Sequence, residues 1–366
     1  MSAALSINGT ALARRPFVFI GAGAVGGPTT GLLANLGMRR CVLIDPKRYQ
    51  LTSIATQCEP DEVGRLKVEA VAGRLRTMGV KATPLAVDVG AVEPGWVEDD
   101  AVIVVSADNR RADILANRLA AMMQAALVKV NIEPKYHWIS VRAYDLRSDA
   151  PAVCLECPMT DAQYAAQRHP AGCEGDGERP TGSPRALCQA AAGVAALAAA
   201  RLADGCPDWF GRQWDLNLAA GRATWCDLPA NPDCRWEHGR RWRNRIRLDR
   251  DPTGVTPADL LKLAGRPSPS GVRWRLSARA ALAVRCGGCG RDAPVLAWAS
   301  RLSEPIGSCR CGGELLPVPF CTFEELRAAD LDGWLDRPLA DWGVPPRAIL
   351  AVDTGDGEQQ SFVVGA

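Results

Sequence analysis

The stretch FVFIGAGAVGG, residues 17–27, opens the part of the chain that decides the fold. Four apolar residues predict a buried strand, and a glycine-rich turn follows at once. A second apolar run, residues 41–44, ends on Asp45. Glycines let the backbone approach a phosphate at a helix N-terminus, and an acid at the next strand end can hold a ribose. The stretch therefore predicts a nucleotide-binding βαβ unit.

Strand-like and helix-like segments continue to alternate from residue 16 to about residue 147. Such alternation is typical of a parallel sheet with helices on both faces. The expected helices are 31–37, 68–78 and 111–125, and the expected strands are 102–105 and 126–130. Polar alternation in 138–146 indicates an antiparallel strand at the edge. The predicted fold is α/β, with a Rossmann-like, doubly wound, mostly parallel sheet.

Composition places the chain among globular proteins of ordinary charge. It has 366 residues, a formal net charge of +2 and 14 cysteines. This charge gives no general attraction to nucleic acid or membrane, so neither partner is expected. The arginine-rich run 240–247 is more typical of a solvated strand, or of a face for an acidic protein, than of a nucleic-acid-binding surface. Closely spaced cysteine pairs favour metal sites over disulfides, so we expect a cytoplasmic protein without a signal peptide.

The chain is expected to form two domains, 1–245 and 246–366. The first contains a cysteine-bearing loop, 150–185, rich in proline and glycine. Beyond that loop we expect helices at 184–203, 256–263 and 323–334, and strands at 214–225 and 348–352.

A second set of cysteines marks the C-terminal domain. Cys286-Gly-Gly-Cys289 and Cys309-Arg-Cys311 have the spacing of a zinc ribbon at about 280–320. We expect the two pairs on either side of one hairpin. The usual role of a ribbon is structural.

The order of several motifs resembles the ThiF/MoeB family of adenylating enzymes, which includes ubiquitin-activating enzymes. The resemblance covers roughly residues 16–240 and implies that the domain 1–245 is an adenylation domain. It is carried by the glycine loop, Asp45, Thr56-Gln57, Gly64-x-x-Lys67 and Asp108.

The resemblance implies that the chain uses ATP and magnesium. The implied nucleotide-binding residues are Gly21, Gly23, Gly26, Asp45, Gln57, Lys67, Asp108 and Asn109. Asp45 would bind the ribose, and Lys67 would contact the phosphates as a point charge. Asp108 would hold magnesium, a hard cation that prefers carboxylate oxygen. Lys67 and Asp108 would thereby serve catalysis, with Arg111 as a neighbour that helps.

The chain departs from the family pattern at several positions. Ser53 and Thr56 stand where the family has asparagine and a phosphate-holding arginine, and Lys47 replaces an acid. Lys47 or Arg48 are the candidates to supply the missing charge. The N-terminal arginine helix of the family is reduced to Arg14-Arg15.

A first zinc site follows from the resemblance, in which two cysteine pairs bind one structural ion. Here Cys154 and Cys157 would be completed by Cys234 and His238, with Glu237 as a weaker alternative to the histidine. The chain would thus carry two structural zinc sites.

A thiol close to an acyl-adenylate can capture the acyl group as a thioester. Cys173, in the loop 150–185, is the first candidate for this nucleophile. Cys188, near a helix N-terminus that favours thiolate, is the second. The alternative that neither cysteine acts as a nucleophile stays open.

The leading hypothesis is ATP- and magnesium-dependent adenylation of the C-terminal carboxylate of a small ubiquitin-like or sulfur-carrier protein. Residues 246–366 would recruit this carrier or a conjugating-enzyme-like protein, and the chain is expected to form a homodimer. The alternatives are an adenylating enzyme that modifies a ribosomal peptide, a degenerate nucleotide-binding scaffold and an NAD-dependent oxidoreductase. The scaffold is suggested by Ser53 and Thr56, whereas the oxidoreductase leaves Gln57, Lys67 and Asp108 unexplained.

Overall fold

The computed structural model describes residues 9–147, 153–166, 183–236, 238, 241–266, 268–298, 305–318, 321–353 and 358–365. The chain divides into two compact units. Unit 1 comprises Met1–Val92 and Val97–Arg241, and unit 2 comprises Glu93–Trp96 and Trp242–Ala366.

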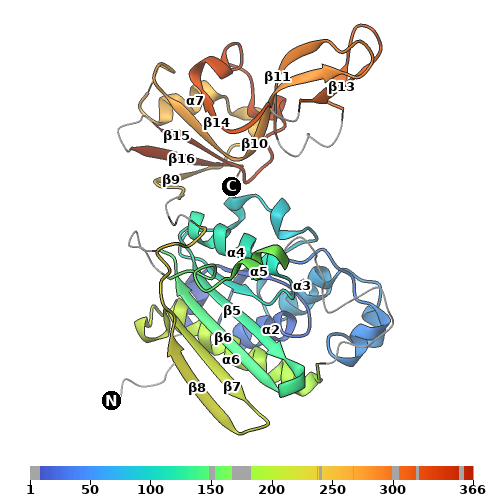
Figure 1. Cartoon of the computed structure of the whole chain (residues 1–366), viewed down its shortest axis with the longest axis vertical. Helices are drawn as coiled ribbons and strands as arrows, with labels where there is room; N and C mark the ends of the chain where they lie inside the picture. The colour runs from blue at the N-terminus through green and yellow to red at the C-terminus, as the bar shows by residue number, and fades with distance from the viewer. Residues whose placement is uncertain are drawn as a thin grey trace. The chain divides into compact units, whose positions relative to one another are not determined.

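Unit 1 is built on an eight-stranded sheet (Figure 1). Its strands are, in spatial order, β3 (Lys81–Leu85), β2 (Arg40–Ile44), β1 (Phe17–Ile20), β4 (Val102–Val105), β5 (Ala126–Glu133), β6 (Trp138–Asp145), β7 (Arg212–Asn217) and β8 (Arg222–Asp227). The first five strands are parallel, and β6, β7 and β8 continue the sheet antiparallel. The predicted α/β fold with a mostly parallel sheet and an antiparallel edge is therefore confirmed.

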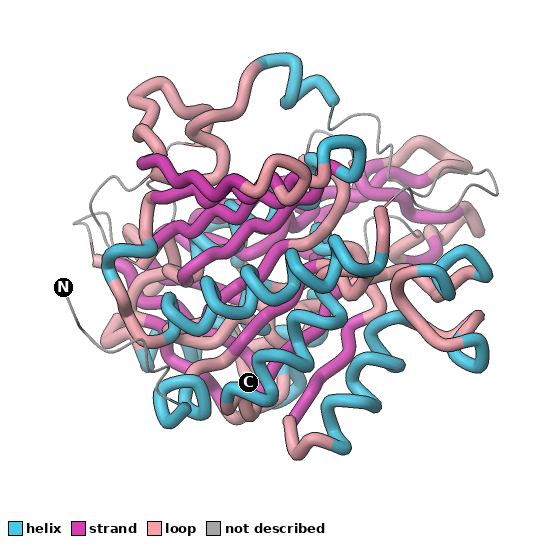
Figure 2. Tube along the Cα trace, turned by 90° about the horizontal axis from the view of Figure 1, so that it is seen from below, coloured by secondary structure: helices cyan, strands magenta, loops and turns pink. Residues whose placement is uncertain are grey.

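Helices cover both faces of this sheet (Figure 2). The α-helices of unit 1 are α1 (Gly9–Arg14), α2 (Gly26–Leu36), α3 (Lys67–Thr77), α4 (Arg110–Met122), α5 (Asp161–Ala166) and α6 (Arg185–Ala203). Helices α2, α3 and α6 share one apolar core, to which β1 contributes Phe17 and Phe19. Helix α4 packs on β4 and β5 through other residues. The alternation of strand-like and helix-like segments along the sequence predicted this layering.

Helix α6 is, among the described residues, the one helix long and apolar enough to cross a membrane. That test considers length and composition only, and 61 % of the apolar stretch is buried. The helix packs on β4, β5 and β6 through its alanine-rich face. These contacts identify α6 as a core helix of unit 1.

Unit 2 contains a second, mostly antiparallel sheet. Its strands are β9 (Arg245–Leu248), β10 (Arg273–Cys286), β11 (Asp292–Trp298), β12 (Gly307–Ser308), β13 (Glu314–Pro317), β14 (Thr322–Arg327), β15 (Ile349–Asp353) and β16 (Gln359–Val364). The long strand β10 pairs with β11, β13, β14 and β15. Three fully buried tryptophans in its core are Trp274, Trp298 and Trp342.

The single α-helix described in unit 2, α7 (Pro257–Leu263), begins where the sequence predicts. Thr256 caps it, because its hydroxyl accepts from the Asp259 amide and the Asp259 carboxylate accepts from the Thr256 amide. This reciprocal capping with proline at the first helical position is a strong start signal.

The helix predicted at 323–334 is wrong. Residues Thr322–Arg327 form strand β14, and Ala328–Leu331 form a short 3-10 helix, η9. Phe323 is exposed and Leu326 is buried against the core of unit 2. Pairing with β10 overrides the helical preference of the Glu, Leu and Arg residues in this segment.

A four-residue segment between β3 and β4 belongs to unit 2 rather than to the unit that surrounds it in sequence. Its Glu93 carboxylate accepts from the Ser277 hydroxyl at 3.0 Å and from the Trp298 indole at 3.3 Å. Gly95 is closely enclosed, since a Cβ there would lie 2.3 Å from the Arg347 carbonyl. Burial raises the pKa of Glu93 above its ordinary value.

Replacing Glu93 with Gln should change how stability depends on pH. The raised pKa means that ionised Glu93 disfavours the folded state, so wild-type stability falls as pH rises from about 4.5 through the folded-state pKa. The Glu93→Gln variant keeps an acceptor but cannot ionise. The free energy of unfolding of the variant relative to wild type, measured with denaturant at several pH values, should therefore rise as pH increases from about 4.5 through the folded-state pKa of Glu93. If the difference in unfolding free energy between variant and wild type does not change with pH, Glu93 does not have a raised pKa in the folded state.

Candidate functional site

A cavity of about 520 Å³ lies in unit 1 at the carboxyl ends of the parallel strands. Residues from the ends of β1, β2, β4 and β5 line it. Ligands of open α/β sheets bind at this edge, because the connecting loops converge there. Of the residues singled out for nucleotide binding, the cavity is lined by Gly21, Gly23, Asp45, Gln57, Lys67, Asp108 and Asn109.

Gly26 is the predicted residue that does not line the cavity. A Cβ at this position would lie 2.0 Å from the Gly21 carbonyl oxygen and 2.4 Å from Ser106 Oγ. Gly26 therefore allows α2 to begin close against the end of β1. Gly21 itself has a φ of 96°, which favours glycine.

Asp45 ties the glycine loop to the end of β2. One carboxylate oxygen accepts from the Ala22 amide at 2.8 Å, and the other accepts from the Lys47 amide at 2.9 Å. Each oxygen keeps a further lone pair, so the residue can also meet a ligand hydroxyl. Asp45 thus orders the loop in addition to facing the cavity.

The polar stretch before α3 is folded into a 3-10 helix, η1 (Leu51–Ala55). The Ser53 hydroxyl accepts from the Gln50 amide at 3.0 Å and caps this helix. Thr56 is buried and does not line the cavity. The Gln57 side chain does line it, and a Cβ on Gly23 would lie 3.4 Å from Gln57 Oε1.

Lys67 is the first residue of α3 and is almost fully buried. Its ammonium lies 5.9 Å from the centre of the Tyr49 ring, and its backbone amide donates to the Lys47 carbonyl at 3.0 Å. The charge is therefore held at the cavity wall by the surrounding chain.

Asp108 and Asn109 follow β4 and lead into α4. The Asn109 side chain accepts from the Ala112 amide at 2.8 Å and so caps α4. Asp108 Oδ2 lies 4.0 Å from Lys47 Nζ, and both residues line the cavity. Arg111 does not line the cavity and pairs with Asp88, whereas its neighbour Arg110 does line it.

A buried ion pair supports the loop 106–109, which connects β4 to α4. It was not predicted from the sequence. Lys129 Nζ lies 2.6 Å from Asp113 Oδ1 and donates to the Ala107 carbonyl at 2.7 Å. Both side chains are enclosed, and Arg110 reaches the other oxygen of Asp113 at 3.2 Å. The available signal was a lysine inside the otherwise apolar run 126–130.

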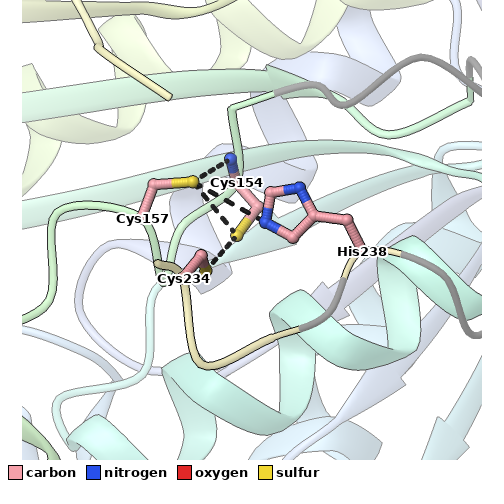
Figure 3. Close-up of side chains that lie close together, drawn as sticks. All are labelled: Cys154, Cys157, Cys234 and His238. Carbon is pink, nitrogen blue, oxygen red and sulfur yellow. Dashed lines mark hydrogen bonds between the residues drawn. The ribbon is translucent and has the colours of Figure 1, made fainter. Parts of the chain in front are cut away.

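The first predicted metal cluster is assembled in unit 1 (Figure 3). The ligand atoms of Cys154, Cys157, Cys234 and His238 all lie within 4.8 Å of one another. Hydrogen bonding with Cys154 lowers the pKa of Cys157 to about 5, which favours the thiolate that binds metals. Three sulfurs and one imidazole suit zinc. Glu237 lies outside the described residues.

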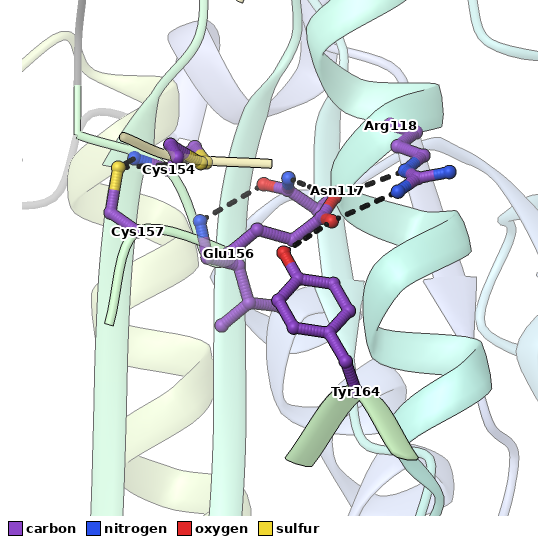
Figure 4. A network of polar contacts seen from close by, with 8 residues as sticks. Asn117, Arg118, Cys154, Glu156, Cys157 and Tyr164 are labelled. Atoms are coloured by element: carbon purple, nitrogen blue, oxygen red, sulfur yellow. Dashed lines mark hydrogen bonds and ion pairs between the residues drawn. The ribbon is translucent and has the colours of Figure 1, made fainter. Parts of the chain in front are cut away.

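A buried carboxylate joins this cluster to α4 (Figure 4). Glu156, between the two cysteines of the pair, accepts from both Arg118 and Asn117 of α4 and from the Tyr164 hydroxyl of α5. The Leu155 amide donates to the Asn117 side chain at 3.0 Å. Both oxygens of Glu156 accept hydrogen bonds in this network, so the cysteine turn is held on α4.

The second cluster lies in unit 2. The ligand atoms of Cys286, Cys289, Cys309 and Cys311 also lie within 4.8 Å of one another. The pairs sit at the tips of two hairpins, β10–β11 and β12–β13, and not on either side of a single one. The Cys289 amide donates to Cys286 Sγ at 3.4 Å and lowers the pKa of Cys286 to about 6.

Of the two candidate nucleophiles, Cys188 belongs to the described part of the chain. Cys173 lies outside the described residues. Cys188 is fully buried in α6, and burial raises the pKa of its thiol. A buried thiol of raised pKa is unsuited to attack an acyl-adenylate, contrary to the effect expected from the helix N-terminus.

Comparison with known proteins agrees with this arrangement. Residues 9–236 match the ThiF family. The solved structure of E. coli MccB with ATP is similar, with a TM-score of 0.50 and 16 % identity over 62 % of this chain and 67 % of MccB. PaaA is similar with a TM-score of 0.51 and 20 % identity, over 60 % of this chain and 75 % of PaaA. At these identities the likeness shows a shared fold. No curated protein matches the chain.

Removing Lys129 should destabilise unit 1 strongly. Lys129→Met leaves the buried Asp113 carboxylate without its closest cation, which typically costs about 3–5 kcal/mol. The double variant Lys129→Met/Asp113→Leu removes both charges and should recover most of this loss. Urea unfolding of the three proteins measures the difference, and a single variant as stable as wild type would show that the pair has no such role.

Each cysteine cluster should hold one zinc ion. Metal analysis of the purified protein should therefore give two equivalents, and one equivalent should be lost separately in Cys234→Ser and in Cys309→Ser. Cys226→Ser, which changes an exposed cysteine outside both clusters, is the matched control and should keep both ions. Full zinc content in Cys234→Ser would refute the first site.

Proposed function

The chain belongs to the ThiF family, and we propose that it binds ATP in the cavity of unit 1 and adenylates a carboxylate. In this reaction a carboxylate oxygen attacks the α-phosphorus, the bond to the leaving pyrophosphate breaks, and an acyl-adenylate forms. The observation that carries the proposal is that one cavity gathers the glycine loop, Asp45, Lys67 and Asp108.

Each of these groups suits a part of the nucleotide. The Gly21–Gly23 loop lets backbone come close to phosphate oxygens, and the spare lone pairs of Asp45 can accept from ribose hydroxyls. Lys67 and Arg110 bring positive charge to the cavity wall. Such fixed charges stabilise the negative charge that shifts to the leaving pyrophosphate.

Asp108 is the residue that would hold magnesium. Its carboxylate is a hard oxygen ligand at the cavity wall, and about a third of the side chain is exposed. Bound magnesium would neutralise phosphate charge during the transfer. Lys129 and Asp113 keep Asp108 in place through the Ala107 carbonyl.

The acceptor of the adenylate is proposed to be the C-terminal carboxylate of a small ubiquitin-like or sulfur-carrier protein. A ribosomal peptide is the second candidate. It is favoured by the similarity to the Microcin C7 biosynthetic enzyme MccB, which has been solved in complex with N-formylated MccA. If the acyl group passes to a thiol, Cys173 is the proposed acceptor, because Cys188 is buried.

Exchange of labelled pyrophosphate into ATP tests the adenylation step. Exchange should appear when the acceptor is added, and Asp108→Asn should lower its rate by about 100-fold or more, since it removes a charge that acts on the reacting phosphates. Asp100→Asn makes the same change on an exposed residue outside the cavity and should leave the rate unchanged.

The acceptor that the pyrophosphate exchange requires distinguishes between the candidate substrates. Exchange that requires a carrier protein ending in glycine supports the first substrate class, and exchange that requires a short peptide supports the second. Tight ATP binding without exchange for any acceptor would indicate a scaffold. Binding of NADH in preference to ATP would overturn the proposal.

A further inference from the structure

The strand order divides the cavity of unit 1 into two ends. Strands β2 and β1 lie on one side of β4, and β5 lies on the other. The proposed function places the nucleoside at the first end, where Asp45 and the glycine loop line the cavity, and the phosphates near Asp108, which follows β4. Because the nucleoside fills that end, the carboxylate that attacks the α-phosphorus approaches from the β5 end. The β5 end is lined by Val130, Asn131, Ile132, Pro134, Arg110 and Asp113.

A chain of three charges lies at the β5 end. Asp113 Oδ1 lies 2.6 Å from Lys129 Nζ, and Asp113 Oδ2 lies 3.2 Å from Arg110 Nη1. Two cations thus share one carboxylate, and one positive charge of the group is left without a counter-charge. Charges removed from water are costly unless they are balanced, so this group favours the binding of an anion.

The surplus positive charge is presented to the cavity by Arg110. The side chains of Lys129 and Asp113 are 1 % and 3 % exposed, whereas that of Arg110 is 38 % exposed and lines the cavity. In the described part of the chain, its guanidinium makes one ion pair, through Nη1 to Asp113. A guanidinium has several N–H donors in a fixed planar fork, so the remaining donors can hold a carboxylate.

The neighbouring cation does not share these properties. Arg111 pairs one to one with Asp88, and it does not line the cavity. Its charge is therefore balanced within the protein. Of the two consecutive arginines at the start of α4, Arg110 is the one that is placed to bind a ligand.

The surroundings of Arg110 suit the end of a peptide better than a phosphate group. Next to it the cavity is lined by the apolar side chains of Val130, Ile132 and Pro134 and by the amide side chain of Asn131. An amide can both donate to and accept from a peptide group. Phosphates favour clusters of backbone N–H groups, and the glycine loop at the other end supplies that kind of site.

We infer that Arg110 binds the C-terminal carboxylate of the acceptor, in addition to contributing positive charge to the cavity. One carboxylate oxygen pairs with the guanidinium while the other attacks the α-phosphorus, and Asp113, itself held by Lys129, fixes the guanidinium in place. The pairing keeps the carboxylate ionised and oriented. This inference rests on the proposed function. It applies to a carrier protein and to a ribosomal peptide alike, because both end in a carboxylate.

The test compares peptides that differ only in their terminal group. The probes are two short peptides, one ending in Gly-Gly to represent a carrier tail and one ending in serine to represent a ribosomal peptide. Each is made as the free carboxylate and as the C-terminal amide. Their affinities for the full-length, zinc-loaded protein are measured by calorimetry, with an ATP analogue whose α–β bridge cannot be cleaved. Wild type should bind the carboxylate form of one peptide about tenfold or more tightly than its amide, as expected for a charge-assisted hydrogen bond.

Substitution of Arg110 should remove this preference without abolishing nucleotide binding. In Arg110→Met the carboxylate and amide forms should bind equally. The affinity for ATP alone should fall by less than about threefold, because the lost charge acts on the phosphates only at a distance. Arg110→Lys keeps the charge but not the planar fork, and it should keep part of the preference.

Arg40→Met is the matched control. Arg40 is a partly exposed arginine that begins β2, pairs with Glu98 and does not line the cavity. The control variant should show the wild-type preference for the carboxylate form. Thermal unfolding of every variant checks that the fold is intact.

The results separate this inference from the proposed function. A wild type that binds the carboxylate and amide forms equally, or binds neither, overturns the role of Arg110. A loss of ATP affinity of about tenfold in Arg110→Met, with the preference retained, assigns Arg110 to the phosphates and also overturns it. In each case adenylation still stands if ATP binds. If wild type binds no ATP, the proposed function fails, and a carboxylate preference that disappears in Arg110→Met still supports the carboxylate site. The peptide that shows the preference identifies the class of acceptor.

Discussion

A buried ion pair, Lys129–Asp113, supports the loop on which the candidate site depends. Lys129 lies on β5. Its ammonium pairs with the Asp113 carboxylate of α4 and donates to the Ala107 carbonyl. Charges buried in this way are costly unless they are paired, and here Asp113 is paired with Lys129 and with Arg110, while Lys129 also donates to the backbone. The residue that follows Ala107 is Asp108, so its position at the cavity is set by a contact beneath it.

Helix α4 connects this site to the first metal cluster. Its N-terminus carries Asn109 and Arg110 at the cavity, and a later turn carries Asn117 and Arg118, which bind Glu156 and the Leu155 amide. The cysteine turn is thereby held to the same helix as the cavity-lining residues Asn109 and Arg110. A structural ion in this cluster would therefore stabilise the helix that positions the site, even though it takes no part in the chemistry.

Much of the candidate site followed from the order of short motifs along the chain. Gly21, Asp45, Lys67 and Asp108 lie far apart in sequence but each follows a strand or begins a helix, and the carboxyl ends of parallel strands meet at one edge. The second cysteine cluster was predictable from local ligand spacing, whereas the first, which joins Cys154 and Cys157 to Cys234 and His238, followed from the family resemblance. Gly26 does not line the cavity, and its role in close packing was not visible in the sequence, because a glycine needed for packing and one needed for phosphate approach look alike there.

The sequence by itself determined the βαβ start, the mostly parallel sheet and the cysteine set of the C-terminal ribbon, because hydrophobic periodicity, glycine turns and cysteine spacing are local properties. The first set of metal ligands followed from the family resemblance. Only the tertiary structure decided that 323–334 is not a helix, that Glu93 belongs to unit 2 and that Lys129 supports Asp108. It also showed that Lys47 lines the cavity whereas Arg48 does not, and that Cys188 is buried. These features depend on strand pairing, burial and contacts between residues distant in sequence, which no local pattern records.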